Sequence, residues 1–362
     1  MNLLEHAGKS LLAVAGINVP QGYVCRNLDE VAVAAEALGP CVVKAQVPAG
    51  RRGKAGGIRL ADNIEEAVAA AEQVFDMVIG GHVVRELLVE QQVEIVEEIY
   101  VALVNDPETK GPMLLFSAEG GMEVEDLVRE RPETLLRLPV DIRDGMGQVP
   151  LERGVSQLIQ ILYLLFIEAD AELLEINPLV RTVDGELVAL DCKLAFDDSS
   201  AWRQPDLVEI SEPERLTALE ARARDMGLRY IELDGDVGIL ANGAGLTMTT
   251  MDAVTHYGGR PANFLEIGGE AYTRAKDALS LVLSNPRVKS LLVNFCGAFA
   301  RTDVMTEGLL AAWDEVPDDM PVFFTIHGTG DEEAVAMIRD RLGMEPFELM
   351  DDAVVAAVEA AR

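Results

Sequence analysis

Positively charged side chains and glycines crowd one short segment of this chain. Lys44 stands at the end of an expected strand, and Arg51, Arg52 and Lys54 follow it in a loop that contains Gly53. Glycine lets backbone N–H groups come close to phosphate oxygens, while lysine and arginine neutralise the phosphate charge. The Walker pattern GxxxxGK[ST] is absent. The composition therefore favours a phosphate-binding loop of another type, with a flexible surface loop as the alternative.

Oxygen-bearing side chains gather in a second segment and in its expected hairpin partner. Glu175 and Asn177 lie two residues apart, so strand alternation places them on one face. The partner strand can bring Asp191 beside them. Such oxygens suit Mg²⁺, which commonly takes one or two protein ligands together with nucleotide phosphates. A row of solvated strand charges is the alternative.

Glycine loops follow the expected strands of the C-terminal part. They begin at Asn242, Gly268, Gly297 and His327. Ligands of open α/β sheets bind at the carboxyl ends of the strands, and these four loops would share that edge. A ligand crevice is therefore predicted there.

The first half of the chain shows the pattern of antiparallel hairpins with helices on one side. Helices are expected at 2–15, 27–38 and 151–169, and strands at 22–25, 41–47, 83–90, 98–105, 113–117, 171–176 and 187–190. Turn residues separate several of these segments, as at Gly39-Pro40. This order is typical of an α+β domain.

Strand, loop and helix alternate strictly in the last third of the chain. The expected strands are 237–241, 263–265, 290–295 and 322–326, and the expected helices are 247–257, 271–283, 304–313 and 332–342. Near-continuous apolar strands indicate a parallel sheet covered on both faces, as in a doubly wound, flavodoxin-like α/β domain. We therefore expect a first domain at 1–205, a linker and helix at 206–232, and a second domain at 233–362.

The charge balance narrows the classes of partner. The 362 residues include 62 acidic and 30 basic side chains, for a net charge of −32. A surface this negative repels nucleic acid and anionic membranes, so neither is an expected partner. No apolar run reaches the roughly 18 residues of a membrane helix. The N-terminal residues lack the features of a secretory signal. We expect a cytoplasmic protein with reduced, buried cysteines at Cys25, Cys41, Cys192 and Cys296.

Stretches spread over almost the whole sequence resemble one family. They are Val43-Lys-Ala-Gln46, Arg52-Gly-Lys-Ala-Gly-Gly57, Ser117-Ala-Glu-Gly-Gly-Met-Glu123, Glu175-Ile-Asn-Pro-Leu-Val180, Leu190-Asp-Cys-Lys-Leu194, Trp202-Arg-Gln-Pro-Asp206, 237–245 and Gly258-Gly-Arg-Pro-Ala-Asn-Phe-Leu265. In this order they resemble the β subunit of succinyl-CoA synthetase and its relatives, the ADP- or GDP-forming acyl-CoA ligases, including enzymes that act on malate.

The resemblance implies an ATP-grasp domain followed by a flavodoxin-like ligase domain. It also implies a reaction in which ATP or GTP phosphorylates a histidine of a partner α subunit. The phosphoryl group then passes to a dicarboxylic acid, and coenzyme A displaces phosphate from the acyl phosphate. Because the resemblance places the histidine and the nucleotide site on different subunits, it implies an αβ or α₂β₂ complex. It also implies Mg²⁺ as the metal ion.

The resemblance also assigns roles to particular residues of this chain. Nucleotide contacts are implied for Lys44, Arg51, Arg52, Gly53, Glu90 and Glu98. Asn177 and Asp191 are implied to hold Mg²⁺, and Glu175 to orient the phosphohistidine. Binding of the carboxylate substrate is implied for Asn242, Gly297, Ala298, Phe299 and Ala300.

The chain departs from the family pattern at several positions of the expected site. Ala298 replaces a glycine and Phe299 adds bulk in the loop that shapes the carboxylate pocket, so malate or another dicarboxylic acid stands beside succinate as the expected substrate. Glu270 adds a charge in a glycine loop, and Pro48 replaces a histidine. Two alternatives are a different ATP-grasp carboxylate ligase, which would work without a partner, and a non-catalytic nucleotide-binding subunit.

Overall fold

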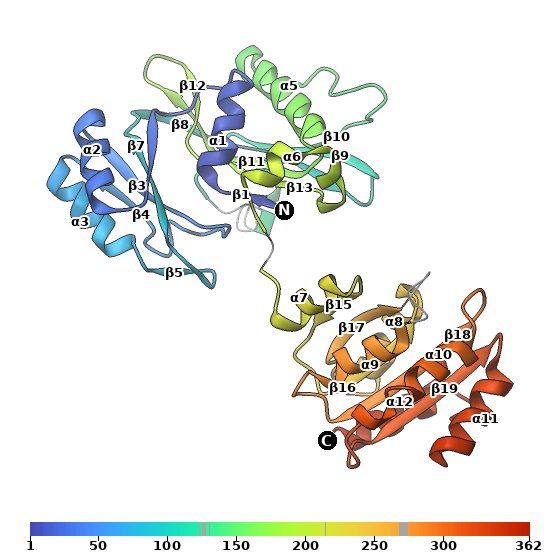
Figure 1. Cartoon of the computed structure of the whole chain (residues 1–362). Coiled ribbons are helices and arrows are strands. Elements are labelled where there is room, and N and C mark those ends of the chain that lie inside the picture. Colours follow the sequence, from blue (N-terminus) through green and yellow to red (C-terminus); the bar gives the residue numbers. More distant parts are fainter. Residues whose placement is uncertain (123, 125–127, 130, 214, 268–273) are drawn as a thin grey trace. The chain divides into compact units, whose positions relative to one another are not determined.

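Two compact units, Met1–Glu214 and Arg215–Arg362, make up the chain (Figure 1). The computed structural model describes residues 1–122, 124, 128–129, 131–213, 215–267 and 274–362. The expected glycine loop at Gly268, the substitution at Glu270 and the start of the helix expected at 271 lie outside the described residues.

A small antiparallel sheet forms one half of the first unit. Its order is β2 (Gly22–Cys25), β7 (Glu86–Gln91), β3 (Cys41–Gln46) and β4 (Ile58–Ala61). The helices α2 (Leu28–Leu38) and α3 (Ile64–Val74) cover one face and enclose an apolar core. Both helices begin at an asparagine cap, Asn27 or Asn63, whose side chain accepts from the backbone N–H three residues later. A short hairpin of β5 (Val78–Ile79) and β6 (His82–Val83) precedes β7.

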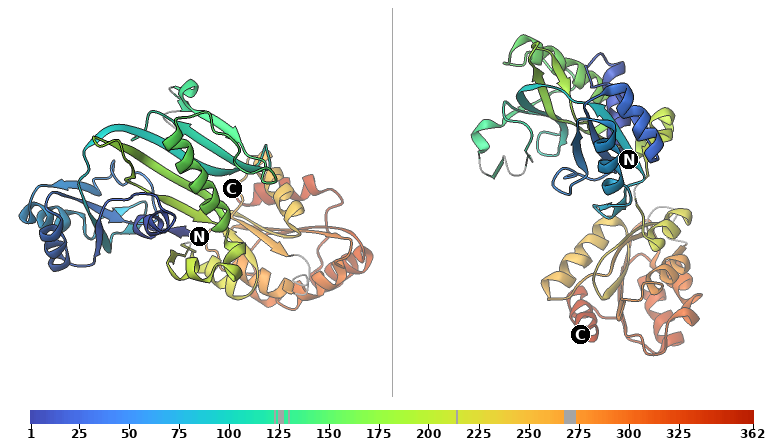
Figure 2. Two further views of the ribbon diagram at one scale, coloured as in Figure 1. Left: turned by 90° about the horizontal axis from the view of Figure 1, so that it is seen from above. Right: turned by 90° about the vertical axis from the view of Figure 1, so that its left-hand side faces the viewer.

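A larger antiparallel sheet forms the other half of the first unit. Its order is β10 (Leu136–Pro139), β9 (Gly111–Ser117), β8 (Ile95–Asp106), β11 (Ala171–Thr182), β13 (Lys193–Phe196), β1 (Asn2–Leu3) and β14 (Ser211–Glu212), with β12 (Leu187–Ala189) paired to β11. The helix α5 (Arg153–Glu168) packs along one face (Figure 2). The helices α1 (Glu5–Val14) and α6 (Pro205–Glu209) also belong to this part of the unit.

The second unit is a five-stranded sheet between helices. Its order is β15 (Arg229–Glu232), β17 (Asn263–Ile267), β16 (Val237–Asn242), β18 (Ser290–Gly297) and β19 (Val322–Gly328). All pairs are parallel except β15 with β17. One face packs on α8 (Ala244–His256) and α12 (Met350–Ala360), and the other on α9 (Ala275–Leu283), α10 (Thr302–Leu310) and α11 (Asp331–Leu342). The helix α7 (Ala218–Asp225) precedes β15.

The fold class expected from the sequence, α+β followed by a doubly wound parallel sheet, is confirmed. Several details differ. The first helix begins at Glu5, because Asn2 and Leu3 form the strand β1 between β13 and β14. The strands β4, β10, β13 and β15 and the helices α3 and α12 were not expected. Cys25, Cys41 and Cys192 are buried as expected, but Cys296, near the carboxyl end of β18, is exposed.

Candidate functional site

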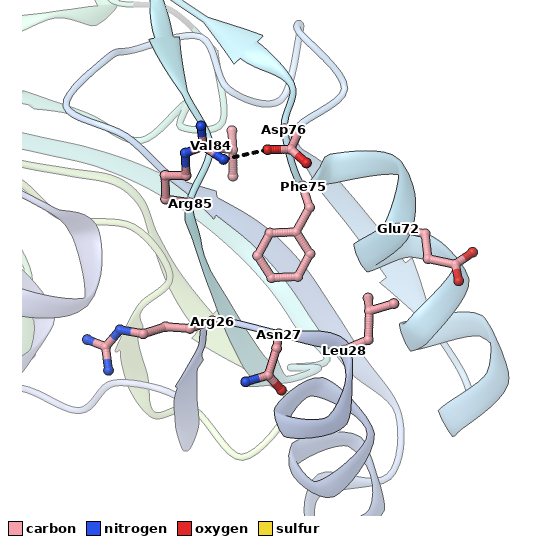
Figure 3. Close-up of a pocket in the computed structure, with 8 residues that line it drawn as sticks. All are labelled: Arg26, Asn27, Leu28, Glu72, Phe75, Asp76, Val84 and Arg85. Carbon is pink, nitrogen blue, oxygen red and sulfur yellow. Dashed lines mark hydrogen bonds and ion pairs between the residues drawn. The ribbon is translucent and has the colours of Figure 1, made fainter.

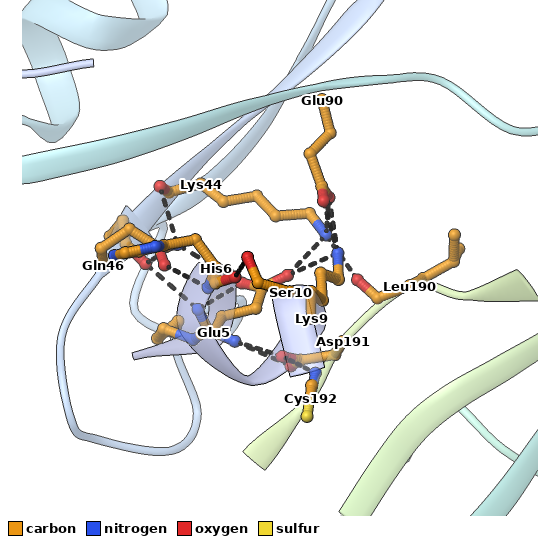
Figure 4. Close-up of polar contacts among 12 residues, drawn as sticks. Glu5, His6, Lys9, Ser10, Lys44, Gln46, Glu90, Leu190, Asp191 and Cys192 are labelled. Carbon is orange, nitrogen blue, oxygen red and sulfur yellow. Dashed lines mark hydrogen bonds and ion pairs between the residues drawn. The ribbon is translucent and has the colours of Figure 1, made fainter. Parts of the chain in front are cut away.

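A buried cluster of charged side chains joins α1 to the small sheet and to the segment after β12 (Figure 4). Glu5 lies at its centre and is 3% exposed. Its Oε1 accepts from Lys44 Nζ at 3.0 Å and from Lys9 Nζ at 2.9 Å, and its Oε2 accepts from Arg52 Nη1 at 2.5 Å. One carboxylate of the first helix therefore contacts three cations.

Two further carboxylates complete the charge cluster. Glu90 lies 2.6 Å from Lys9 Nζ and 2.7 Å from Lys44 Nζ. Asp191 accepts two hydrogen bonds from Arg52 Nη2, at 2.6 and 2.8 Å. The cluster therefore contains three positive and three negative side chains, so its charges balance.

Strand alternation explains why the cluster lies where it does. Val43 and Ala45 of β3 point into the core beneath α2 and α3. Lys44 and Gln46 therefore lie on the opposite face, where Leu88 and Glu86 of β7 are their register partners. Within α1, a spacing of four residues places Glu5 and Lys9 on one side of the helix.

Electrostatics keep the central groups ionised. Burial alone raises the pKa of Glu5, but the charges of Lys44, Lys9 and Arg52 outweigh it and hold that pKa well below its ordinary value. Burial alone lowers the pKa of Lys44, yet Glu5 and Glu90 raise it above its ordinary value. The same balance, with Glu5 and Asp191 as partners, raises the pKa of Arg52. These three side chains are charged at neutral pH.

A second group of residues surrounds a glycine turn after β9. The backbone N–H of Gly121 donates to Asn177 Oδ1 at 3.0 Å, and Asn177 Nδ2 donates to the carbonyl of Met122 at 2.8 Å. Gly121 has φ +74° and lies directly against the Glu98 carboxylate, so a β-carbon there would collide with it. Asn177 therefore holds the turn closely over β8.

Glu175 lies on the same strand as Asn177. Leu174 and Ile176 point into the core against α5, so Glu175 and Asn177 share the opposite face of β11, as alternation predicts. Tyr100, which is buried, donates its hydroxyl to Glu175 Oε2 at 3.3 Å.

The structure brings some of the expected nucleotide and metal residues together, but it keeps others apart. Four of them lie in the charge cluster, namely Lys44, Arg52, Glu90 and Asp191. The glycine turn holds Glu98 and Asn177, and Glu175 lies next to Tyr100. In contrast, Arg51 and Gly53 lie on the exposed side of the loop. Arg51 has a left-handed backbone with φ +62°.

Sequence reasoning missed Glu5 and Lys9. Both are buried, together with Ala7, Gly8 and Leu12 of α1. A glutamate and a lysine four residues apart on the buried stripe of an otherwise apolar helix are the signal that could have found them. Gln46, whose Nε2 lies 3.4 Å from Glu5, was also missed as a site residue.

The expected substrate residues lie at the carboxyl edge of the second sheet. Asn242 Nδ2 donates to the carbonyl of Cys296 at 2.8 Å, and Asn242 Oδ1 accepts from its N–H at 2.7 Å. A β-carbon on Gly297 would lie 2.6 Å from the carbonyl oxygen of Thr329. Beyond this close contact Ala298 and Phe299 are exposed, whereas Ala300 packs against the core.

A pocket of about 440 Å³ lies elsewhere in the first unit, between the start of α2 and the end of α3 (Figure 3). Leu28 and Phe75 line it from the helix-covered side of the small sheet, opposite the face that carries Lys44. Its Arg85 already donates to Asp76 at 2.7 Å. None of the residues expected to bind a ligand lines this pocket.

The described residues contain neither a membrane-spanning helix nor a cluster of metal-ligating side chains. None of the helices in the described residues has the length and apolar character that a bilayer span requires. Within the same residues, no three side chains of histidine, cysteine, aspartate or glutamate are grouped so that they could hold a metal ion.

Comparison with known proteins covers both units. Residues 2–181 match the model of the ATP-grasp domain, and residues 240–353 match that of the CoA-ligase domain. The succinate–CoA ligase [ADP-forming] subunit beta of Rubrobacter xylanophilus is 42% identical over 379 residues, and that of Desulfurococcus amylolyticus is 39% identical over 378. Each alignment covers 100% of this chain and 99% of the relative.

A solved structure shares the whole fold. The ATP citrate lyase of Methanothrix soehngenii, in complex with citrate and coenzyme A, aligns with a TM-score of 0.74 over 99% of both chains at 20% identity. With relatives near 40% identity along its entire length, the chain belongs to the family of β subunits of ADP-forming succinate–CoA ligases.

Proposed function

We propose that this chain is the nucleotide-binding subunit of a ligase that joins a dicarboxylic acid to coenzyme A while ATP is cleaved to ADP and phosphate. Lys44 and Arg52, both 8% exposed, are the observation that carries the proposal. Two buried cations on neighbouring elements, in a chain of net charge −32, form a local site for polyphosphate. Phosphoryl transfer depends mainly on such positioning and charge neutralisation.

Asn177 and Asp191 offer a donor set that fits Mg²⁺. Both present hard oxygens, and the Asp191 side chain is 31% exposed. The Asn177 amide oxygen accepts one hydrogen bond, from Gly121, and retains a second lone pair. In this proposal the two residues hold the ion, and nucleotide phosphates and water supply the remaining ligands. When bound, Mg²⁺ neutralises part of the phosphate charge.

Glu175 is the residue that we assign to the phosphohistidine of a partner α subunit. The hydrogen bond from Tyr100 holds Glu175 Oε2 on the strand face that also carries Asn177, and in this proposal the carboxylate accepts from an imidazole N–H. A carboxylate at one ring nitrogen orients the ring and favours transfer at the other. The arrangement is consistent with a histidine that is supplied by another chain.

Substrate choice is assigned to the carboxyl edge of the second sheet. Asn242 and the segment 297–300 are the proposed binding residues for the acid. Phe299 is fully exposed and free to lie against a ligand or a partner chain. We propose that its bulk disfavours succinate relative to another dicarboxylic acid. Free thiols at all four cysteines agree with the proposed cytoplasmic location.

Titration and reconstitution test the proposed function. The isolated chain is expected to bind Mg-ADP in calorimetry and to form no acyl-CoA with any acid. Addition of an α subunit from a related ligase should produce an αβ or α₂β₂ complex that turns over. Full turnover by the isolated chain would favour a different ATP-grasp carboxylate ligase. Absence of Mg-ADP binding would favour a subunit that has lost its nucleotide site.

A further inference from the structure

The two cations of the proposed nucleotide site are already occupied by protein groups. Lys44 Nζ has three partners, at 3.0 Å from Glu5, 2.7 Å from Glu90 and 2.6 Å from the carbonyl of Leu190. An ammonium group has three N–H donors, so these contacts use all of them. Both terminal nitrogens of Arg52 are also engaged, one by Glu5 and one by Asp191. A phosphate that binds the Lys44 ammonium or the terminal nitrogens of Arg52 must therefore replace an existing partner.

The existing partners fall into two kinds. The side chains of Glu5 and Glu90 are 1% and 3% exposed, and each contacts at least two cations. In contrast, the Asp191 side chain is 31% exposed, and Leu190 is only partly buried. These last two are consecutive residues of the one connection between β12 and β13. Their contacts reach solvent, whereas the contacts of the two glutamates do not.

We propose that Glu5 is a positioning residue of the nucleotide site, which holds Lys44 and Arg52 in place while phosphate oxygens replace the contacts of Leu190 and Asp191. The inference rests on the proposed nucleotide-binding function. Glu5 can serve this role because its two oxygens reach the two cations separately, Oε1 to Lys44 and Oε2 to Arg52. In this role Glu5 fixes the separation of the two cations and does not depend on Leu190 and Asp191, whose contacts the phosphate replaces. Release from Arg52 also leaves the oxygens of Asp191 available to a metal ion.

A charge-matched pair of variants tests the two roles. Glu5→Gln and Asp191→Asn each remove one negative charge next to Arg52. Calorimetric titration with ADP in excess EDTA measures binding of the nucleotide without metal. Asp191→Asn should bind metal-free ADP at least about threefold more tightly than the wild type, because a competitor for Arg52 is weakened.

The opposite result is expected for the buried carboxylate. In Glu5→Gln, one carboxylate oxygen is replaced by an amide N–H₂, which cannot accept a hydrogen bond from Lys44 or Arg52. At least one of these cations therefore loses its fixed partner. Metal-free ADP should bind about tenfold more weakly, the size of one lost charge-assisted hydrogen bond. An account based on charge alone predicts that both variants bind more tightly, and that result would overturn the proposal.

The titration also separates positioning from folding. If Glu5 only supports the fold, fewer molecules bind, but those that bind keep the affinity of the wild type. A fall in stoichiometry at constant Kd would therefore refute the proposal. Glu36→Gln, on the exposed side of α2, is the control for net charge and should leave Kd unchanged.

A second variant decides the matter if Glu5→Gln does not fold. Glu5→Asp keeps the charge but is one methylene shorter, so it cannot reach both cations at their present separation. We expect its affinity for metal-free ADP to fall about fivefold or more. Unchanged affinity would contradict a positioning role. If the wild type binds no ADP with or without Mg²⁺, the proposed function fails, and that outcome is distinct from the others.

Discussion

Lys9→Met is the substitution that tests the energetics of the charge cluster most directly. Among the residues that the structure describes, the partners of the Lys9 ammonium are carboxylates, at 2.9 Å from Glu5 and 2.6 Å from Glu90, and Lys9 is 3% exposed. Methionine keeps much of the side-chain volume and removes the charge. Two buried carboxylates are then left with one cation fewer, and loss of one partner from a buried ion pair costs about 3–5 kcal/mol.

The pH dependence of that loss has a defined sign. In the wild type Glu5 has a lowered pKa, because its attraction to Lys44, Lys9 and Arg52 outweighs burial. Its stabilising contribution is therefore present above the unfolded pKa and is lost as the pH falls through the lower folded value. Lys9→Met raises the folded pKa of Glu5. The destabilisation should be largest at neutral pH and should shrink as the pH falls through that raised pKa.

Hydrogen exchange during urea unfolding measures this effect within the first unit. Peptides from β3 and β7 report the opening free energy around the cluster, apart from the second unit. Lys110→Met, an exposed lysine in the turn between β8 and β9, is the matched control and should change stability by less than about 0.5 kcal/mol. A loss below about 1 kcal/mol in Lys9→Met at neutral pH would refute the view that the cluster depends on each cation.

Three further predictions address the chemistry. Asp191→Asn should weaken binding of Mg-ADP at least about tenfold with the fold intact, and unchanged affinity for Mg-ADP in calorimetry would remove Asp191 from the metal site. Glu175→Gln should bind ATP nearly normally yet slow phosphorylation of the partner subunit by about 100-fold or more, as measured with labelled ATP; equal labelling with wild type and variant would contradict the assigned role. Phe299→Ile in the reconstituted complex should shift kcat/KM towards succinate by about 10–200-fold relative to the acid preferred by the wild type. Succinate as the best substrate of the wild type would refute that last expectation.

The sequence predicted most of the fold because its signals are local. Apolar runs followed by glycine loops identified the parallel strands of the second unit, and a glycine-rich loop after Lys44 identified one side of the charge cluster. The edge strand β15 is short and polar at both ends, Arg229 and Glu232, so it lacks the apolar pattern by which strands are found. Its place is determined by pairing with β17, more than 30 residues later.

The central residue of the cluster could not be predicted in the same way. Glu5 is the single acidic residue of α1 and carries no motif. Its importance follows from contacts with Lys44 and Arg52, which come after α2 in the sequence and about 40 residues or more after Glu5. Asp191, 139 residues beyond Arg52, joins them only when the larger sheet has formed. Contacts of this kind depend on the tertiary fold, and short-range patterns do not encode them.

The position of β1 and α1 has a consequence for synthesis on the ribosome. The strand β1 is made before its partners, because it lies between β13 and β14, whose residues are about 190–210 positions later in the chain. At roughly 5–20 residues per second, the first helix waits on the order of 10–40 s for these neighbours. During that interval the side of α1 that is buried in the folded protein is exposed to water. Glu5 and Lys9 place charges on this side, which is apolar in a typical core helix. We expect this pair to keep the nascent segment from associating with other unfinished chains until the larger sheet closes around it.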